Sequence, residues 1–585
     1  MKRFEPFLGL AALVALVGGA AGQGARQLRA SEALLNADFE LPAFEGAKGL
    51  PFWRVRSGTP RIEGGVLILP PGSEVSQPIA APPGTWPRSE ARGSGSFEVY
   101  HRDSAGRRAP DPAGAESNSD GLPPAEPRLE VFLRCPPGAT QAARIEELSS
   151  SVLLPEAEAI EALLEAELRH CLEPWLEQAL DSSGPRATAF VTRQIDADTG
   201  LAVGPESRKV SIHPVYTQLL AAWRLSPRPE WEAALVRYAE DFLSVGIHPE
   251  TGLPRAFDPV RDEPLDQVAI EIRAHLDFLI DLFEDGPRGE REQALGERAL
   301  AAAVRAGERI LASGRLPDGS VAAKYVPATG QPDTGVVELR RLDVPSQLAR
   351  LARHTGREDF AAAAREAVLA FDHTRYWPGT WDRIDPGFDD EYGHYGARAV
   401  TMWRALPEEV TFRGVALSGL ETYLPLWYGA LAHGGNIAAD QVRCWEIAAA
   451  CAELEPSLAP EVMAVLERAA HQHWTGQQNR SGVWIDTTVV GFDPQNLPVG
   501  DTRGVPQNLL LGLGVLAGLQ VGEPQASTVA RFLAVLDRTR EVFGAEFGYV
   551  DGPPGSGSRS GGGRAALGSL RIAPGLLGMW AALAD

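Results

Sequence analysis

Cysteine is scarce in this sequence, with four among 585 residues, and no Cys/His spacing resembles a zinc site. Cys444 and Cys451 lie seven residues apart on one expected helix, about 10 Å along its axis. That separation exceeds the reach of a disulfide, whereas Cys135 and Cys171 either pair or remain two buried thiols. The sequence therefore indicates neither a metal site nor a cofactor.

Basic residues are also few, with 55 Lys and Arg against 77 Asp and Glu, which gives a formal net charge of −22. Binding nucleic acid requires a basic face that neutralises phosphates. The charge balance therefore argues against nucleic acid as a partner. An acidic surface is common among soluble exported proteins, so the net charge excludes a nucleic-acid partner but does not identify a function.

Long hydrophobic runs are missing beyond the N-terminus. Residues 1–22 combine a basic start, an apolar stretch over 7–17 and small residues at 20–22, the pattern of a secretory signal peptide. The apolar stretch is short for a membrane span, although a membrane anchor is the alternative. We therefore expect a secreted or periplasmic protein with no membrane association after cleavage. The sequence gives no indication of oligomeric state.

Several motifs of other enzyme classes are absent. The sequence has no P-loop, no Rossmann glycine pattern and no G-x-S-x-G at a strand-to-helix turn. The segment "DADTGL" at 196–201 begins like a calcium loop but lacks the glycine and the later glutamate of an EF-hand. These absences direct attention to the chain's overall organisation.

The chain is expected to be a multidomain α+β protein that begins with a small antiparallel β-sandwich over 31–152. Short alternating runs such as "RIEGGVLILPP" and "RLEVFLRC" are separated by Pro and Gly. The segment "LLNADFE" at 34–40, followed by Trp53, resembles the start of galactose-binding-like jelly rolls. That resemblance implies a carbohydrate-binding module, and the alternative is a purely structural domain.

Residues 155–585 have helical periodicity and an internal repeat. Six segments read as helices that are apolar on nearly all sides, as buried helices are. More amphipathic helices lie between them. The stretches before the six segments are also alike, and most begin with a turn and continue into a short β-like run. The six segments are 210–223, 264–283, 336–352, 410–432, 504–519 and 565–584.

This recurrence resembles the (α/α)6 toroid, in which six inner helices form a barrel inside six outer ones. Known toroids of this kind are largely glycosidases, polysaccharide lyases and sugar epimerases. The resemblance implies that the loops before the inner helices converge at one end of the barrel and line a shared cavity. The richest of these loops is "RIDPGFDDEYGHYGARAVTMW" at 383–403.

Two chemistries fit the residues of these loops. Hydrolysis of a glycosidic bond needs two carboxyl groups that flank the scissile oxygen. β-Elimination on a uronate needs a base, an acid and a group that stabilises the substrate carboxylate. The catalytic candidates are Asp389, Asp390, Glu391, Tyr392, His394, Tyr395, His213, Asp262 and Asp486.

Cationic, amide and aromatic side chains in the same loops are candidates for binding substrate. They are Arg208, Arg255, Arg341, Arg398, Trp403, Trp484, Arg503, Asn508 and Tyr549. The arginines favour an acidic glycan. We therefore expect an enzyme that cleaves a poly- or oligosaccharide. The alternatives are a non-catalytic glycan-binding scaffold on the same fold and a sugar epimerase.

Overall fold

The computed structural model describes most of the β-strand region and much of the helical region. The described residues are 29–31, 53–80, 88–103, 108, 128–180, 188–203, 213–258, 263–287, 290–333, 342–370, 398–417, 450, 454–460, 462–463, 466–467, 470, 505–550 and 565–584.

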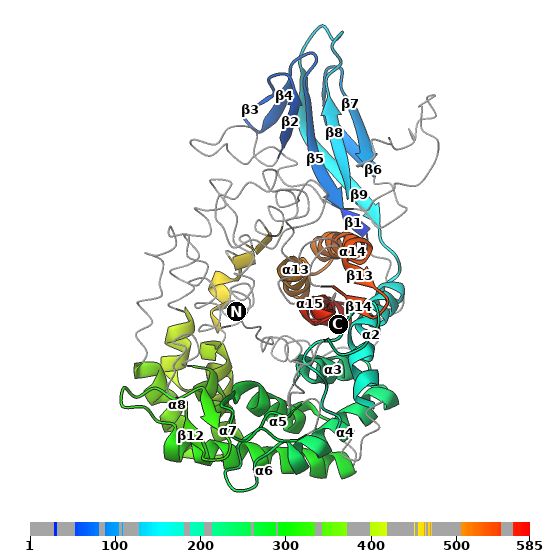
Figure 1. The fold of residues 1–585 in the computed structure, drawn as a ribbon. Coiled ribbons are helices and arrows are strands. Elements are labelled where there is room, and N and C mark those ends of the chain that lie inside the picture. The colour runs from blue at the N-terminus through cyan, green and yellow to red at the C-terminus, as the bar shows by residue number, and fades with distance from the viewer. Residues whose placement is uncertain are drawn as a thin grey trace.

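Two antiparallel sheets form the N-terminal part of the chain (Figure 1). One sheet has the order β1-β9-β4-β3, with β6 also paired to β9, and the other has the order β2-β5-β8-β7. The strands of the first sheet are β1 (Arg29–Ser31), β3 (Arg61–Glu63), β4 (Val66–Leu69), β6 (Arg88–Ser94) and β9 (Ala143–Leu153). Those of the second are β2 (Arg54–Ser57), β5 (Glu74–Ala80), β7 (Glu98–Asp103) and β8 (Arg128–Arg134).

The two sheets share one hydrophobic core, so this part of the chain is a β-sandwich. Leu67 and Ile145 of the first sheet are buried in the same cluster as Val75 and Leu133 of the second. Alternation along each strand produces this arrangement, because successive side chains point to opposite faces. Trp53 is part of this core and is only 4% exposed. The jelly-roll resemblance stays a prediction, since the segment 34–40 lies outside the described residues.

The rest of the described chain is mainly helical, as expected, and its long helices form two layers. The inner layer contains α3 (Pro214–Leu225), α5 (Arg273–Asp285), α7 (Asp343–Thr355), α13 (Gln507–Leu519) and α15 (Leu567–Ala584). The outer layer contains α2 (Ala157–Leu180), α4 (Pro229–Val245), α6 (Glu290–Ser313), α8 (Glu358–Ala370) and α14 (Glu523–Phe543). A single 3-10 turn, η5 (Pro456–Leu458), is described between α8 and α13.

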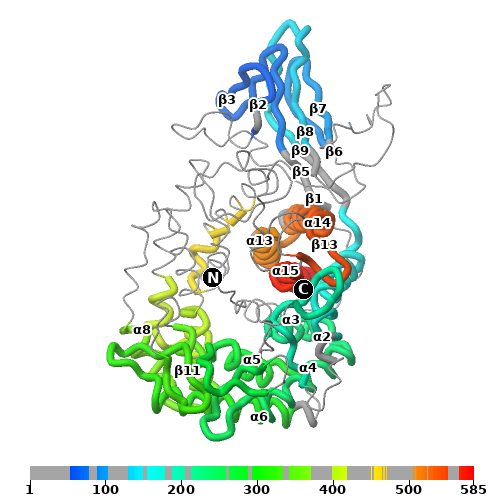
Figure 2. The backbone as a smooth tube through the Cα atoms, in the orientation of Figure 1, coloured from blue at the N-terminus to red at the C-terminus, as the bar shows by residue number. Residues whose placement is uncertain are grey.

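The inner helices pack side by side around an arc. Along this arc α13 contacts α15, α15 contacts α3, α3 contacts α5, and α5 contacts α7. The last helix therefore meets the first inner helix, as Figure 2 shows where the red end of the chain lies beside the green α3. This return is what a helical toroid requires. The sixfold count also depends on segments outside the described residues.

Each of four outer helices is followed by a short hairpin before the next inner helix. Antiparallel bridges join Ile195 to Ala202, Ile247 to Pro254 and Arg315 to Val321, and a two-stranded ribbon joins β13 (Gly544–Ala545) to β14 (Gly548–Tyr549). The turns contain glycines with positive φ, which side-chain-bearing residues adopt at a cost. The predicted turn before each of these inner helices is confirmed.

Two predicted boundaries are wrong. The helix expected over 264–283 begins only at Arg273, and Ile270–Glu271 form β10, which pairs with β11 (Lys324–Val326). Val268, Ile270 and Ile272 alternate, so this stretch has the period of a strand. β11 pairs in turn with β12 (Gln331–Pro332).

The predicted loop 383–403 is also shorter than expected, because residues 398–405 are helical. This segment begins with Arg398 against Asp343, the first residue of α7. Its last residues, Arg404 and Ala405, share a cavity with His354 near the end of α7. The segment therefore runs beside α7 in the same direction and occupies the inner layer. The helix expected over 410–432 is described only for 410–417.

The most apolar long helix of the described residues is α15, which by length and composition could cross a membrane. It is largely buried against α2, α3 and α13, and that burial accounts for its composition. Cys135 and Cys171 are both free and buried, so these two do not pair. Cys135 belongs to the sandwich core and Cys171 to the helical core.

Candidate functional site

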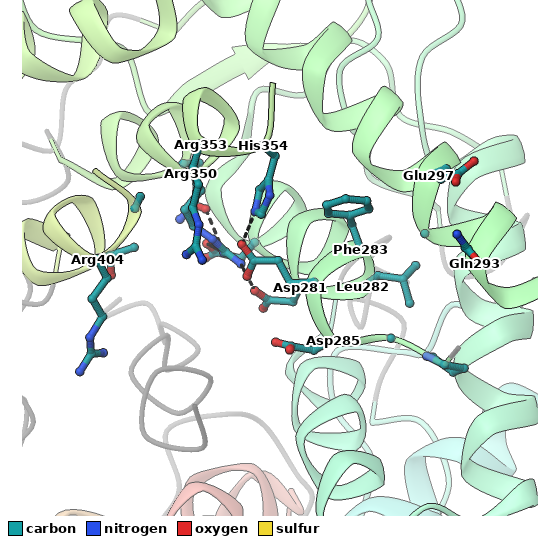
Figure 3. Close-up of a pocket in the computed structure, with 18 of the residues that line it drawn as sticks. Asp281, Leu282, Phe283, Asp285, Gln293, Glu297, Arg350, Arg353, His354 and Arg404 are labelled. Atoms are coloured by element: carbon teal, nitrogen blue, oxygen red, sulfur yellow. Dashed lines mark hydrogen bonds and ion pairs between the residues drawn. The ribbon is translucent and has the colours of Figure 1, made fainter. Parts of the chain in front are cut away.

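A cavity of about 750 Å³, whose lining includes many charged residues, lies between α5, α6, α7 and the helical segment 398–405. Its walls come mainly from the C-terminal halves of α5 and α7 and from the start of α6. Figure 3 shows Arg350 and His354 reaching from α7 toward Asp281, with Arg404 on the far side. The cavity extends inward along α5 as far as Asp277.

Acidic side chains recur along one face of α5. Asp277, Asp281 and Asp285 are spaced four residues apart and all line the cavity, as does Glu284. Residues four apart lie one above the other on a helix, so this spacing produces a stripe of carboxylates. Such a stripe is unusual on a helix whose remaining residues are mostly buried and apolar.

Arg350 on α7 is the principal partner of this stripe. One guanidinium nitrogen, Nη2, donates to Asp281 Oδ1 at 2.6 Å and to Glu284 Oε2 at 2.5 Å. The other, Nη1, lies 3.7 Å from Asp277 Oδ1. The Arg350 side chain is only 11% exposed, so these interactions are shielded from solvent and from salt.

Asp277 has a different environment from Asp281. Its side chain is 1% exposed, and neither carboxylate oxygen accepts a hydrogen bond from a described residue. Burial raises the pKa of Asp277 to about 7, although Arg398, Arg273 and Arg350 lie near enough to oppose that rise. Asp277 is therefore the carboxyl of this cavity that most readily holds a proton near neutral pH.

The pKa of Asp281 is also raised by burial, but the hydrogen bond and the charge of Arg350 oppose this. Glu284 behaves in the opposite way. Burial would raise its pKa, yet hydrogen bonds from His354 and Arg350 lower it to about 2. His354 Nε2 lies 2.5 Å from Glu284 Oε1. The mouth of the cavity thus holds an ionised Glu284 and the interior holds Asp277.

A second group of charges lies beside the cavity at Arg398, which is one of its lining residues. Arg398 Nε lies 2.9 Å from Asp343 Oδ1, and both side chains are 3% exposed. Arg273 Nη1 donates to the same Asp343 oxygen at 3.4 Å. Arg398 was predicted to bind substrate, and the structure places it on the cavity wall with its guanidinium against Asp343.

Most of the predicted catalytic and binding residues lie outside the described residues and stay predictions. They are Asp262, Asp389, Asp390, Glu391, Tyr392, His394, Tyr395, Asp486, Arg208, Arg341, Trp484 and Arg503. All of them were predicted at the end of the barrel where the inner helices begin. The described cavity opens instead near the C-terminal ends of α5 and α7.

Two predicted residues occupy buried positions. His213 is the N-cap of α3, where its Nδ1 accepts from the Val215 amide at 3.3 Å and its ring packs 4.5 Å from that of Trp175. Burial lowers the pKa of His213 to about 3, so it is neutral at physiological pH. Tyr549 is fully buried, and its hydroxyl donates to Glu167. Neither residue lines the described cavity.

The other described candidates are dispersed. Arg255 donates from Nη2 to the Ile247 carbonyl at 3.0 Å and so braces the hairpin after α4. Trp403 is partly buried against the helical core. Asn508 lies in the first turn of α13. Neither Arg255 nor Trp403 lines the described cavity with Arg398.

The cavity residues on α5 and α7 were missed because both helices belong to a set that was predicted to be mostly apolar on nearly all sides. A signal was present in the sequence. "RAHLDFLIDLFED" repeats an acid every four residues, and "SQLARLARHT" places Arg350 and His354 four apart. Charged residues at helical spacing inside an otherwise apolar helix indicate a buried polar site.

Comparisons with known proteins give no family assignment. No protein-family model matches the sequence, and no curated protein is similar to it in sequence. Among solved structures, an alpha-1,2-mannosidase from Trichoderma reesei is 9% identical with a TM-score of 0.49, over 72% of this chain and 93% of that one.

Two further structures show similarity of the same order. A sugar epimerase from a ruminal bacterium is 12% identical with a TM-score of 0.44, over 72% of this chain and 98% of that one. A polysaccharide lyase is 12% identical with a TM-score of 0.35, over 72% of this chain and 96% of that one. At such low identities and TM-scores, these similarities say nothing about the chemistry of this chain.

Proposed function

We propose that this chain is an exported carbohydrate-active enzyme that hydrolyses glycosidic bonds of a polysaccharide in the cavity between α5 and α7. One observation carries the proposal. Two carboxyl groups, Asp277 and Asp281, line the same cavity one helical turn apart, in different environments. Glycoside hydrolysis needs such a pair, one carboxyl acting as an acid and the other as a base or nucleophile.

The assignment of roles follows from the partners of each group. Asp277 accepts no hydrogen bond from a described residue and has a raised pKa, so it is the general acid that protonates the leaving oxygen. Asp281 accepts a hydrogen bond from Arg350, which stabilises its ionised form. Side chains four apart on a helix have Cβ atoms about 5–6 Å apart. That spacing is closer to the carboxyl separation of retaining than of inverting glycosidases, about 5–5.5 Å against 6.5–9.5 Å.

Hydrolysis is favoured over β-elimination within the described cavity because its lining supplies paired carboxyl groups and no tyrosine. The tyrosines of the elimination hypothesis, Tyr392 and Tyr395, lie outside the described residues. The two reactions leave different products. Hydrolysis leaves new reducing ends only, whereas elimination also leaves an unsaturated uronate that absorbs ultraviolet light.

The test is incubation of the protein with a panel of neutral and acidic polysaccharides, followed by assays of reducing ends and of unsaturated uronate. Asp277→Asn and Asp281→Asn should each abolish release of reducing ends. Glu308→Gln is the matched control, because Glu308 is an exposed acid on α6 that pairs with Arg357, far from the two aspartates in the chain. No cleavage of any polysaccharide, or cleavage that survives both aspartate substitutions, would contradict the proposal.

Export is the second part of the proposal and rests on the N-terminal pattern alone. It predicts that the protein recovered from outside the cytoplasm begins shortly after residue 22. N-terminal sequencing of the native protein tests this. Recovery of the full chain in the membrane fraction would favour the anchor alternative.

A further inference from the structure

The outer face of the sheet β2-β5-β8-β7 carries an aromatic pair covered by arginines. The strand register places Tyr100 of β7 opposite Phe132 of β8. Their rings stack with centroids 4.9 Å apart and an interplanar angle of 2°. Both rings face away from the shared core, since Val131 and Leu133 on β8 point into it.

These two rings are nearly inaccessible although they lie on an outer face, with Tyr100 5% and Phe132 7% exposed. Guanidinium groups contribute to their cover. Arg102 lies 5.0 Å from the Tyr100 ring and 5.4 Å from the Phe132 ring, and Arg108 lies 4.2 Å from the Tyr100 ring. Arg56 lies 5.9 Å from the Phe132 ring.

The carboxylates of this face are engaged elsewhere on it. Glu130 pairs with Arg56 and accepts from Ser76 Oγ, and Glu74 accepts from the Tyr100 hydroxyl at 2.5 Å. Arg134 Nε lies 3.9 Å from Glu74, and the register places exposed Glu98 beside Arg134.

Arg102 lies opposite Glu130 in the strand register and forms an antiparallel bridge with Arg108, so the two arginines lie together at one end of the face. Both are exposed, and neither forms an ion pair within the described part of the chain. An arginine that stacks on an aromatic ring keeps the N–H edges of its guanidinium available, and those edges match a carboxylate or a sulfate with two parallel hydrogen bonds.

We propose that this face, formed by Arg102 and Arg108 over the Tyr100–Phe132 pair, binds the acidic groups of a polyanionic polysaccharide. Charge complementarity identifies the occupant, because two guanidiniums that form no ion pair with a described residue lie on adjoining strand positions, Arg102 and Arg108, of a chain whose net charge is −22. A nucleic acid is disfavoured because its closely spaced phosphates require many basic contacts, and this face offers two. The inference rests on the proposed function, to which it adds the class of substrate.

The binding experiment uses the full chain and measures its affinity for polygalacturonate, for neutral dextran and for a short DNA duplex, at low and at high salt. The double variant Arg102→Gln/Arg108→Gln should bind polygalacturonate about tenfold more weakly, a loss of about 1.4 kcal/mol shared between two surface ion pairs. The matched control is Arg61→Gln/Arg92→Gln. It removes two exposed arginines from the other sheet, where each pairs with nearby glutamates.

Three results would overturn the proposal: equal losses in the two double variants, unchanged binding by Arg102→Gln/Arg108→Gln, or binding of dextran or DNA as tight as that of polygalacturonate. The double variant Arg102→Lys/Arg108→Lys is a control for misfolding. It keeps the charge but loses the planar contact, so an intermediate affinity is expected. Cleavage of short oligosaccharides separates the two proposals, since it should survive loss of this face but not Asp277→Asn.

Discussion

Arg350 of α7 donates a hydrogen bond to Asp281 of α5 at 2.6 Å, and the same nitrogen lies 2.5 Å from Glu284. This contact joins two neighbouring inner helices whose other interface residues are mostly apolar. Asp277 lies within 3.7 Å of the same guanidinium. Arg350 therefore lies close to three carboxylates, although Arg273 and Arg398 also lie near Asp277 and His354 also pairs with Glu284.

Substituting Arg350 by Met should destabilise the protein by about 3–5 kcal/mol, because a buried charge network that loses one partner retains uncompensated charge. The free energy of unfolding from urea titration at pH 7 measures this. Arg353→Met is the matched control. Arg353 is an exposed residue of the same helix, and its loss should change the stability by less than about 0.5 kcal/mol. Similar losses in both variants would contradict a special role for Arg350.

Asp277 should make the stability of the protein depend on pH in an uncommon direction. Its pKa is raised on folding, so it contributes stability below its ordinary pKa of 3.8, and this contribution is lost as the pH rises through about 7. Relative to Asp277→Asn, the wild type should therefore lose stability between pH 4 and pH 7, by up to about 1.4 kcal/mol per pH unit.

Urea titrations of the two proteins at several pH values test this. Asp359→Asn serves as the control, because Asp359 is an exposed acid held by Arg357 on α8 and not a buried one. A constant difference between wild type and Asp277→Asn across the pH range would show that Asp277 is ionised in the folded protein throughout.

The helical layers were predictable because their signal is local. Apolar periodicity located α3, α7, α13 and α15, and Asp-Thr-Gly or Asp-Gly turns located the hairpins. The boundary at Arg273 was missed because the apolar residues of 264–272 were assigned to the helix, whereas Ile270–Glu271 form a strand that pairs with β11. Tertiary pairing of this kind overrides local propensity.

The cavity was harder to predict than the fold. Arg350, Asp281 and Arg398 come from segments about 50 to 120 positions apart in the chain, and nothing local to any of them specifies its partners. The active site was predicted at the loop 383–403 because that loop is rich in polar residues. The described cavity is instead lined mainly by residues of helices. One charged residue per helical turn is weak evidence for a buried polar site until the residues of the neighbouring helix are known.

His213 should make the protein sensitive to acid. Burial lowers the pKa of His213 to about 3, so the folded protein favours the neutral form of the ring. The stability that this preference contributes is full above pH 6.5 and is lost as the pH falls toward 3. Between pH 8 and pH 5 the expected loss from this residue is about 2 kcal/mol.

The variant His213→Asn should reduce the loss of stability between pH 8 and pH 5 by that amount. Asparagine retains an acceptor at the N-cap but does not titrate. Thr217→Ala, in the same turn of α3, removes no titratable group and should keep the wild-type dependence. If His213→Asn loses as much stability as the wild type on acidification, the ring is protonated in the folded protein.

The crossing of α13 and α15 depends on glycine. A methyl group added at Gly575 of α15 would lie 2.8 Å from Leu510 Cβ and 2.9 Å from the Leu510 backbone carbonyl carbon. Such contacts are shorter than real side chains make, and the backbone of α13 cannot yield as a flexible side chain can. Gly575→Ala should therefore destabilise the protein by about 1–3 kcal/mol, despite the better helix propensity of alanine.

Gly518→Ala on α13 is the matched control, because the added methyl group would find only Ala582 Cβ, at 3.9 Å. With no clash, helix propensity decides the sign, and this variant should be more stable than the wild type by up to about 1 kcal/mol. Thermal and urea unfolding of the two variants measure both effects. If Gly575→Ala proves as stable as Gly518→Ala, the two helices are not in close backbone contact at this crossing.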